Sequence, residues 1–330
     1  MVIQLTNKEG RQIKRLLGYS IDMELNGNER RDFELSVSAE DYDNSMDYGC
    51  RIFVADTEYG GILGKLVSST SENTITWQGY TWRGMLASKV IVPPDGQDYY
   101  TVSGELNAIL RDLIEPRFSG VFIVPDTDTG VMVSNWKFDR FCTLLDGISK
   151  LLKSVGYRID IRYNVGEPNG VGWVEVQAVP IVDYTSEVEL SQDSKLNFTA
   201  TDKRNGVNHL IIGGKGELQE RNIIHLYVQA DGSIGKNQHY TGIDEVEYFY
   251  ENTSTDSADV EKSGIEKLEE LMDYKAFDMD IESLGIDAAI GDIVGGRDHI
   301  TGISMGVPVG NIVLTVTDGK VRKEYKLEGT

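Results

Sequence analysis

The spacing of apolar residues changes period along this chain, and this change constrains the fold more than any other feature. Over roughly the first 95 residues, apolar and polar residues alternate, as in the stretch DFELSVS. Alternation is the pattern of a β-strand with one buried face, so Phe33, Leu35 and Val37 are predicted to share one side. About five or six such runs, bounded by Gly, Asp or Ser, predict an antiparallel meander that forms a barrel or a small sandwich.

From about residue 96 to residue 195 the apolar residues first follow a helical period. The stretch SGELNAILRDLIEP predicts an amphipathic helix, with Ser103 placed to cap it and Pro116 to end it. A second helix is predicted from about Phe138 to Val155, with Gly156 after its last turn. The stretches YRIDIRY and GWVEVQA alternate again and predict a hairpin. These residues therefore predict an α+β module.

From about residue 196 the strand pattern returns, with one helix among the strands. The stretch DSADVEKSGIEKLEELMD predicts that helix, although Gly264 weakens it. At the end, NIVLTVTDGKVRKEYKLEG predicts a hairpin around the two-residue turn Asp318-Gly319. One face of this hairpin is predicted to carry Ile312, Leu314, Val316, Val321, Lys323, Tyr325 and Leu327. The order along the chain is thus β, α+β and β.

The formal net charge of -21 at pH 7 argues against a surface that binds DNA or an anionic membrane, because contacts to phosphates require Lys or Arg. An acidic surface can repel nucleic acid, bind cations or keep a protein soluble. The start, MVIQLTNKEG, lacks the basic and apolar segments of a signal peptide, and no apolar run has the length of a membrane span. We therefore expect synthesis in the cytoplasm without a signal peptide, and no membrane insertion.

The stretch NHLIIGGKGELQER places three glycines around a lysine and raises the question of a phosphate-binding loop. The P-loop pattern fails, because Lys215 is followed by Gly216 and His209 stands where the first glycine belongs. The dinucleotide-binding pattern also fails, since Gln219 replaces its third glycine. The glycines instead predict a hairpin or bulge with close backbone approach.

No set of residues in the sequence indicates an active site or a metal centre. The stretch DTDTG begins like a calcium loop, but Lys137 stands at the twelfth position, which needs Glu. The four histidines are scattered, and His209 and His225 are interpreted as hydrogen-bonded strand residues. Cys142 lacks an obvious base. We expect no catalytic residue, no metal and no cofactor, with a carboxylate pair among the 53 acidic residues as an open alternative.

Four stretches, taken in order, resemble the hub proteins at the centre of phage and phage-tail-like baseplates. The first, WQGYTWRGMLASKVIVPP, is similar to the end of the first barrel in these hubs, with Trp82-Arg83, Met85-Leu86 and Lys89 at the patterned positions. The second, VNHLIIGGKGELQERNIIHLYVQADGSIG, is similar to a strand and hairpin of the family. Its closing barrel strands resemble IGDIVGGRDHITGI and IVLTVTDGKVRKEYKLEG.

This resemblance implies a mixed β and α+β fold with two antiparallel, tube-like β-barrel domains and an α+β domain between them. The implied domains are the first barrel at 1–95, the α+β domain at 96–195, the second barrel at 196–240 plus 276–330, and a helical insertion at 241–275.

The resemblance also implies a function. These hubs are homotrimers of the virion tail or baseplate, and they adapt threefold symmetry to the sixfold symmetry of the tail tube. Some of them carry an appended peptidase or cell-wall hydrolase, but for this chain we expect a non-enzymatic hub. The implied partners are further copies of the chain, the tail tube or distal tail protein, the spike or tail-tip protein, and the tape-measure protein. An acidic bore would repel DNA and let it slide, without sequence-specific contacts.

Six residues are candidates for contacts between subunits. Trp77, Trp82 and Arg83 are chosen because aromatic residues and Arg are enriched at interfaces. A second set is predicted to form a charge cluster around the glycine-rich hairpin and consists of Lys215, Glu217 and Arg221. The alternative is that the first set is core and the second a surface ion pair. Two other functions remain open: a carbohydrate- or receptor-binding β-protein of a phage tail, and a carboxylate-dependent cell-wall hydrolase.

Overall fold

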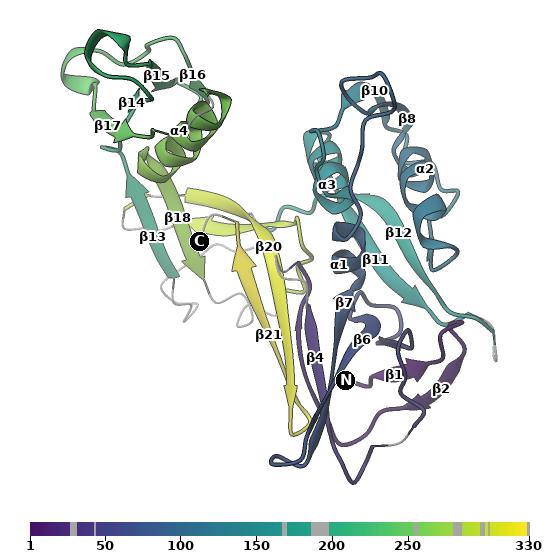
Figure 1. The fold of residues 1–330 in the computed structure, drawn as a ribbon. Coiled ribbons are helices and arrows are strands. Elements are labelled where there is room, and N and C mark those ends of the chain that lie inside the picture. The colour runs from purple at the N-terminus through teal and green to yellow at the C-terminus, as the bar shows by residue number, and fades with distance from the viewer. Residues whose placement is uncertain are drawn as a thin grey trace. The chain divides into compact units, whose positions relative to one another are not determined.

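The computed structural model describes residues 1–26, 32–42, 44–166, 170–185, 198–253, 257–279, 286–297, 301–302 and 304–328 (Figure 1). The chain divides into two compact units. The first contains Met1–Asn197, Met279–Arg297 and Gly306–Thr330, and the second contains Phe198–Asp278 and Asp298–Met305. Among the described residues, no helix has both the length and the apolar character needed to cross a membrane.

A ten-stranded sheet underlies the first unit, in the order β19-β20-β3-β4-β7-β6-β5-β1-β2, with β21 paired to β20. Its N-terminal strands are β1 (Gln4–Thr6), β2 (Gln12–Arg15), β3 (Tyr19–Glu24), β4 (Phe33–Ser38), β5 (Arg51–Phe53), β6 (Gly60–Ser69) and β7 (Thr74–Thr81). Its C-terminal strands are β19 (Ile293–Arg297), β20 (Ser304–Thr317) and β21 (Lys320–Leu327). Phe33, Leu35 and Val37 of β4 are buried, as their alternation predicts.

This sheet joins strands from both ends of the chain. Leu314 of β20 pairs with Met23 of β3, and both side chains are buried. The predicted arrangement of two barrels is therefore not confirmed: in the described part of the chain no sheet closes on itself, and the terminal hairpin extends the N-terminal sheet. An apolar pattern shows which face of a strand is buried, but it does not show which strand lies beside it.

The terminal hairpin has the predicted turn and the predicted face. Thr317 pairs with Lys320 across Asp318 and Gly319, whose φ angles are 52° and 74°. Positive φ at both central residues is the type I′ turn that fits the twist of a hairpin. The register sets Val316 opposite Val321, Leu314 opposite Lys323 and Ile312 opposite Tyr325.

The α+β module contains α1 (Trp82–Ala87), α2 (Leu106–Phe118) and α3 (Leu144–Ser154), with a sheet in the order β11-β12-β9 and the pair β10-β8. Its strands are β8 (Thr101–Glu105), β9 (Phe122–Ile123), β10 (Met132–Lys137), β11 (Tyr157–Asn164) and β12 (Trp173–Pro180). The predicted hairpin is confirmed as the antiparallel pair β11-β12. One hydrophobic core runs from Phe53 and Trp82 through all three helices and the β11-β12 sheet, so the module and the large sheet share it.

The ends of α2 differ from the prediction. Glu105, and not Ser103, caps the helix, because its carboxylate accepts a hydrogen bond from the Ala108 amide at 2.9 Å. Pro116 lies inside the last turn, and the helix ends only at Phe118. A proline removes one backbone donor, but near a helix end the loss is small enough for packing to override it.

The helix α3 begins later than predicted. Its cap is Thr143, whose hydroxyl accepts a hydrogen bond from the Asp146 amide at 3.0 Å, and Phe138 lies before the helix as a buried core residue. Gly156 follows the helix with a φ of 76°, as predicted for a glycine in the left-handed region.

A buried carboxylate lies at the N-terminus of α1. Thr81 caps this helix, and its hydroxyl accepts a hydrogen bond from the Gly84 amide at 3.1 Å. The Asp32 carboxylate accepts hydrogen bonds from the Thr81 amide at 2.9 Å and from the Thr81 hydroxyl at 3.2 Å. Burial raises the pKa of Asp32 from 3.8 to about 6, against the lowering effect of these two hydrogen bonds.

Because the pKa of Asp32 is higher in the folded state than in the unfolded state, its contribution to stability falls as the pH rises from about 4 to about 6. The variant Asp32→Asn keeps a hydrogen-bond acceptor and carries no charge. We expect its free energy of unfolding to rise by about 2 to 3 kcal/mol relative to wild type over this pH window. Urea unfolding of both proteins at several pH values measures the difference. A difference that stays constant with pH would contradict this assignment.

The second unit combines a four-stranded sheet in the order β16-β15-β14-β17 with one helix and the strand pair β13-β18. Its elements are β13 (Phe198–Lys203), β14 (His209–Gly213), β15 (Ile223–Val228), β16 (Ile234–Gly235), β17 (Glu247–Glu251), α4 (Ser257–Leu271) and β18 (Tyr274–Met279). The strand β17 runs parallel to β14, whereas β15 runs antiparallel to it. Leu210, Ile212 and Leu226 of the sheet pack against Val260 and Leu268 of α4.

Residues 241–275, predicted as an insertion, contribute both β17 and α4 to this compact fold. At Gly264, a Cβ atom would lie 2.1 Å from Cδ1 of Ile212. The glycine that weakens the helix in isolation therefore permits α4 to approach β14 closely.

Candidate functional site

The face of the four-stranded sheet opposite α4 carries polar and aromatic side chains. Since side chains alternate along a strand, His209 and Ile211 of β14 lie on the face away from Leu210 and Ile212, which contact the helix. Residues opposite each other in register share a face. The same face therefore also carries His225 and Tyr227 of β15 together with Glu247, Phe249 and Glu251 of β17.

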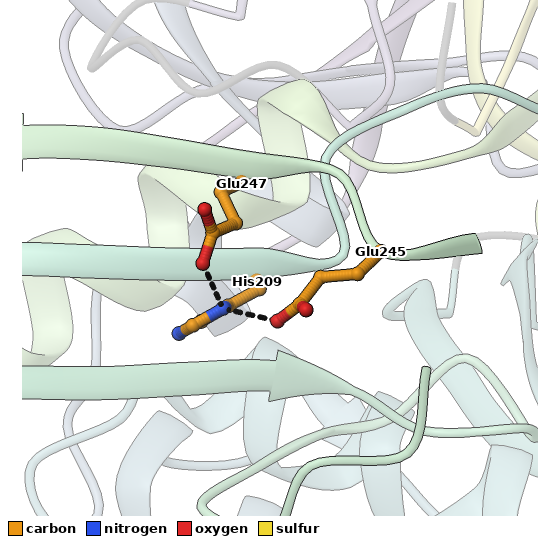
Figure 2. Close-up of side chains that lie close together, drawn as sticks. All are labelled: His209, Glu245 and Glu247. Carbon is orange, nitrogen blue, oxygen red and sulfur yellow. Dashed lines mark hydrogen bonds and ion pairs between the residues drawn. The ribbon is translucent and has the colours of Figure 1, made fainter. Parts of the chain in front are cut away.

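Two carboxylates converge on His209 (Figure 2). The His209 Nδ1 atom lies 2.7 Å from Oε1 of Glu245 and 3.2 Å from Oε1 of Glu247. On the other side of the ring, the His209 Nε2 atom lies 2.8 Å from Nδ1 of His225. Only 7% of the His209 side chain is exposed, compared with 20% for Glu245 and 58% for Glu247. One edge of this His209 cluster (His209, His225, Glu245 and Glu247) is thus open to solvent.

Neighbouring groups hold the cluster in place. The Gln238 amide donates a hydrogen bond of 2.7 Å to Oε1 of Glu245. The Asn208 side chain accepts from the Val246 amide at 2.9 Å and donates to the Asp244 carbonyl at 2.7 Å. The segment that carries Glu245 is therefore tied to the residue before His209.

The protons of the cluster admit two arrangements when His209 is neutral. In one, Nδ1–H donates a hydrogen bond to Glu245, and Nε2 accepts a hydrogen bond from Nδ1–H of His225. In the other, Nε2–H donates to His225, and the lone pair of Nδ1 faces both carboxylates. In the second arrangement the Nδ1 lone pair and one carboxylate oxygen from each glutamate face one another and repel, so this arrangement needs a cation between them. The cluster can thus hold either a proton or a metal ion at one position.

The interpretation of His209 and His225 as hydrogen-bonded strand residues is confirmed. Their wide separation in the sequence did not show that the two rings lie in contact. His209 and His225 are brought together by the β14-β15 hairpin, and its register is the signal that points to this pairing. The two glutamates reach His209 through the parallel pairing of β17 with β14. Two parallel strands need a long connection between them, so a local sequence pattern does not predict their pairing.

The first set of predicted interface residues lies in the interior. Trp77 and Trp82 are each 1% exposed, and Arg83 is 3% exposed. Trp82 stacks on Tyr163, and Arg83 forms an ion pair with Glu58 at 2.8 Å. Side chains with so little exposed surface cannot contact another subunit. Their role is corrected to that of core residues, which was the alternative interpretation.

The second set surrounds the β14-β15 hairpin, which confirms the interpretation of this stretch as a turn between strands. Gly216 has a φ of 112° and sits where a Cβ atom would lie 2.4 Å from the Glu220 carbonyl oxygen, so the loop needs a glycine there. Arg221 forms its ion pair with Glu251, at 2.7 Å, and lies over the ring of Phe249. Lys215 and Glu217 are exposed on the loop. Among the ion pairs between described residues, Arg221 is the member of the predicted cluster that takes part, and its partner Glu251 is on β17.

No family model matches the chain, and no curated protein matches it. Among solved structures, the chain is similar to the prophage tail protein gp18 from Listeria monocytogenes EGD-e, with 14% identity, a TM-score of 0.50, and coverage of 100% of this chain and 95% of that chain. It is also similar to the 43 kDa tail protein of prophage MuSo2 from Shewanella oneidensis, with 16% identity, a TM-score of 0.48, and coverage of 99% and 98%. A tail protein from Neisseria meningitidis MC58 matches with 12% identity, a TM-score of 0.45, and coverage of 99% and 95%.

The likeness to gp18 extends over nearly the full length of both chains and shows a shared fold. At the level of fold, it confirms the resemblance to phage tail proteins that the sequence motifs indicate.

Proposed function

We propose that this chain is a non-enzymatic structural subunit of a phage or phage-tail-like particle, located in the virion tail. The observation that carries the proposal is the end-to-end fold similarity to a protein described as a prophage tail protein. Because a fold alone does not define a function, the proposal also draws on the motifs that resemble baseplate hubs. Those motifs come from both compact units.

Within the tail, we propose the position of a hub at the baseplate or tail tip, where three copies would form a ring. The proposal is supported by sheet edges among the described strands: β2 ends the large sheet, and β16 and β17 end the small one. An unpaired strand edge is a template for a strand from another chain. Closure of the ring would then come from pairing between subunits, and it would not require a closed barrel within one chain.

The proposed partners follow from this position. The ring would contact the tail tube or distal tail protein on one side and the spike or tail-tip protein on the other, with the tape-measure protein near its axis. The net charge of -21 supports a passage for DNA, since an acidic lining repels the phosphate backbone instead of binding it.

Cryo-electron microscopy of tail particles that contain this chain tests the proposal. We expect three copies in one ring, coaxial with the tube. Copies attached to fibres, or absent from the particle, would contradict it. Mass photometry of the purified chain is a second measurement, with a species of three times 36.7 kDa as the expected result.

The alternatives from the sequence gain no support from the described residues. For binding of sugars by ring stacking, Trp77 and Trp82 offer no exposed face because they are buried, whereas Trp136 and Trp173 are partly exposed.

For a hydrolase, one described pocket is lined by the carboxylates Asp56, Glu58, Asp160 and Asp287. Three of them are in ion pairs, Glu58 with Arg83, Asp160 with Arg162 and Asp287 with Lys323, which is an arrangement typical of structural carboxylates.

A further inference from the structure

The His209 cluster has the chemistry of a metal site. It offers one imidazole nitrogen and two carboxylate oxygens, from His209, Glu245 and Glu247, and these atoms lie within 4.8 Å of one another. Mixed nitrogen and oxygen donors suit zinc and its first-row neighbours, whereas calcium and magnesium prefer oxygen ligands alone. The ligand set therefore selects a transition metal.

The distances suit a single ion after a small adjustment. Zinc binds nitrogen and oxygen ligands at about 2.0 to 2.2 Å, so two ligands of one tetrahedral ion lie roughly 3.3 to 3.6 Å apart. The Nδ1 atom of His209 is 2.7 Å from Glu245 and 3.2 Å from Glu247. Glu247 is thus within about 0.1 Å of this range, whereas the Glu245 oxygen has to move outward by about 0.6 Å. The Glu245 side chain is 20% exposed, so it borders solvent and has room for this shift.

The hydrogen bonds around the ligands also fit a metal site. The buried His209 ring has its Nε2 atom 2.8 Å from Nδ1 of His225, and Glu245 accepts a hydrogen bond from Gln238. Metal-bound histidines usually donate their second N–H to such a partner, which fixes the ring and its tautomer. With Nε2 protonated, the lone pair of Nδ1 faces the two carboxylates, and an ion at that position would remove the repulsion.

We propose that His209, Glu245 and Glu247 bind one divalent transition-metal ion, zinc being the best match. Three protein ligands leave a fourth position open to water at the exposed edge. The ion would link β14 to β17 and to the segment before it. Since β17 is an edge strand that reaches the sheet only after a long connection, this link would stabilise the second unit. The proposal does not depend on the proposed role in a phage tail.

Isothermal titration calorimetry of the untagged, chelator-treated full chain with zinc chloride tests the site, with magnesium chloride as a parallel titration. We expect saturable binding of one zinc ion per chain and no comparable response to magnesium. Glu247→Gln should weaken zinc binding at least about tenfold, and the double variant Glu245→Gln/Glu247→Gln should abolish it.

The matched control is Glu251→Gln, which removes a carboxylate from the same strand and the same face without touching the cluster. It should leave zinc affinity unchanged, and circular dichroism checks that every variant is folded. Nitrogen NMR of the histidines adds a readout of geometry, because bound zinc should leave His209 protonated at Nε2 and coordinated at Nδ1. Absence of saturable binding, or equal affinities for wild type and the double variant, would overturn the proposal.

Discussion

Replacing Gly79 by alanine is expected to lower the free energy of unfolding by about 3 kcal/mol. In β7, a Cβ atom at this position would lie 1.9 Å from the carbonyl oxygen of Ile62 and 2.9 Å from the Phe33 ring. The carbonyl belongs to the backbone of the neighbouring strand β6, so rotation of a side chain cannot relieve the overlap. The strands would have to separate, with loss of hydrogen bonds and core packing. Chemical unfolding followed by circular dichroism measures the effect.

The control for this variant is Gly64→Ala in the adjacent strand. A Cβ atom at Gly64 finds no atom nearer than the Gln78 carbonyl oxygen at 3.6 Å, which is ordinary van der Waals contact. We expect Gly64→Ala to change the free energy of unfolding by no more than about 0.5 kcal/mol. Equal losses in Gly79→Ala and Gly64→Ala would show that close strand approach is not the cause.

The second large effect is expected for Arg83→Met, which should lower the free energy of unfolding by about 3 to 5 kcal/mol. The Arg83 side chain is 4% exposed and pairs with Glu58, which is 15% exposed. Two hydrogen bonds, of 2.8 Å and 3.1 Å, join the guanidinium to the carboxylate, and another of 3.3 Å reaches the Ile159 carbonyl. Removal of the cation leaves a desolvated anion without its partner, and it also removes a link between α1 and β11. Thermal and urea unfolding measure the loss.

Two further variants separate charge from packing in this test. The double variant Arg83→Met/Glu58→Gln no longer buries an unpaired charge, so it should recover part of the lost stability. The ion pair between Lys150 and Asp139 has both side chains more than 60% exposed, at 64% and 63%. Lys150→Met should therefore change stability by less than about 1 kcal/mol. A loss in Arg83→Met as small as that in Lys150→Met would contradict a stabilising role for the buried pair.

Arg83 and the two tryptophans show how a motif can be recognised while the role of its residues is misjudged. Aromatic residues and Arg are frequent both in interfaces and in cores, and residue type alone does not separate the two environments. In this chain the stretch from Trp77 to Arg83 passes from the large sheet into α1 and enters the core that the sheet shares with the α+β module. Its residues therefore stabilise the junction within one subunit.

Local patterns in the sequence determined the elements of this protein. The strands with alternating residues, the helix in residues 257–271, the β11-β12 hairpin and the turn at Asp318-Gly319 are all confirmed. Each of these features depends on residues that are neighbours in the chain, so their spacing alone specifies them. The loop after β14 was also predicted correctly, because its glycines fail every test for a phosphate site and match a hairpin.

The tertiary structure alone decided which strands pair and which side chains meet. The pairing of β20 with β3 joins the two ends of the chain, and the parallel pairing of β17 with β14 carries Glu247 to His209. Backbone hydrogen bonds are the same for every sequence, so a strand edge does not encode its neighbour, and long-range contacts are selected only when the whole core packs. For that reason the pattern could predict a turn at Lys215, whereas the His209 cluster became visible only in the folded chain.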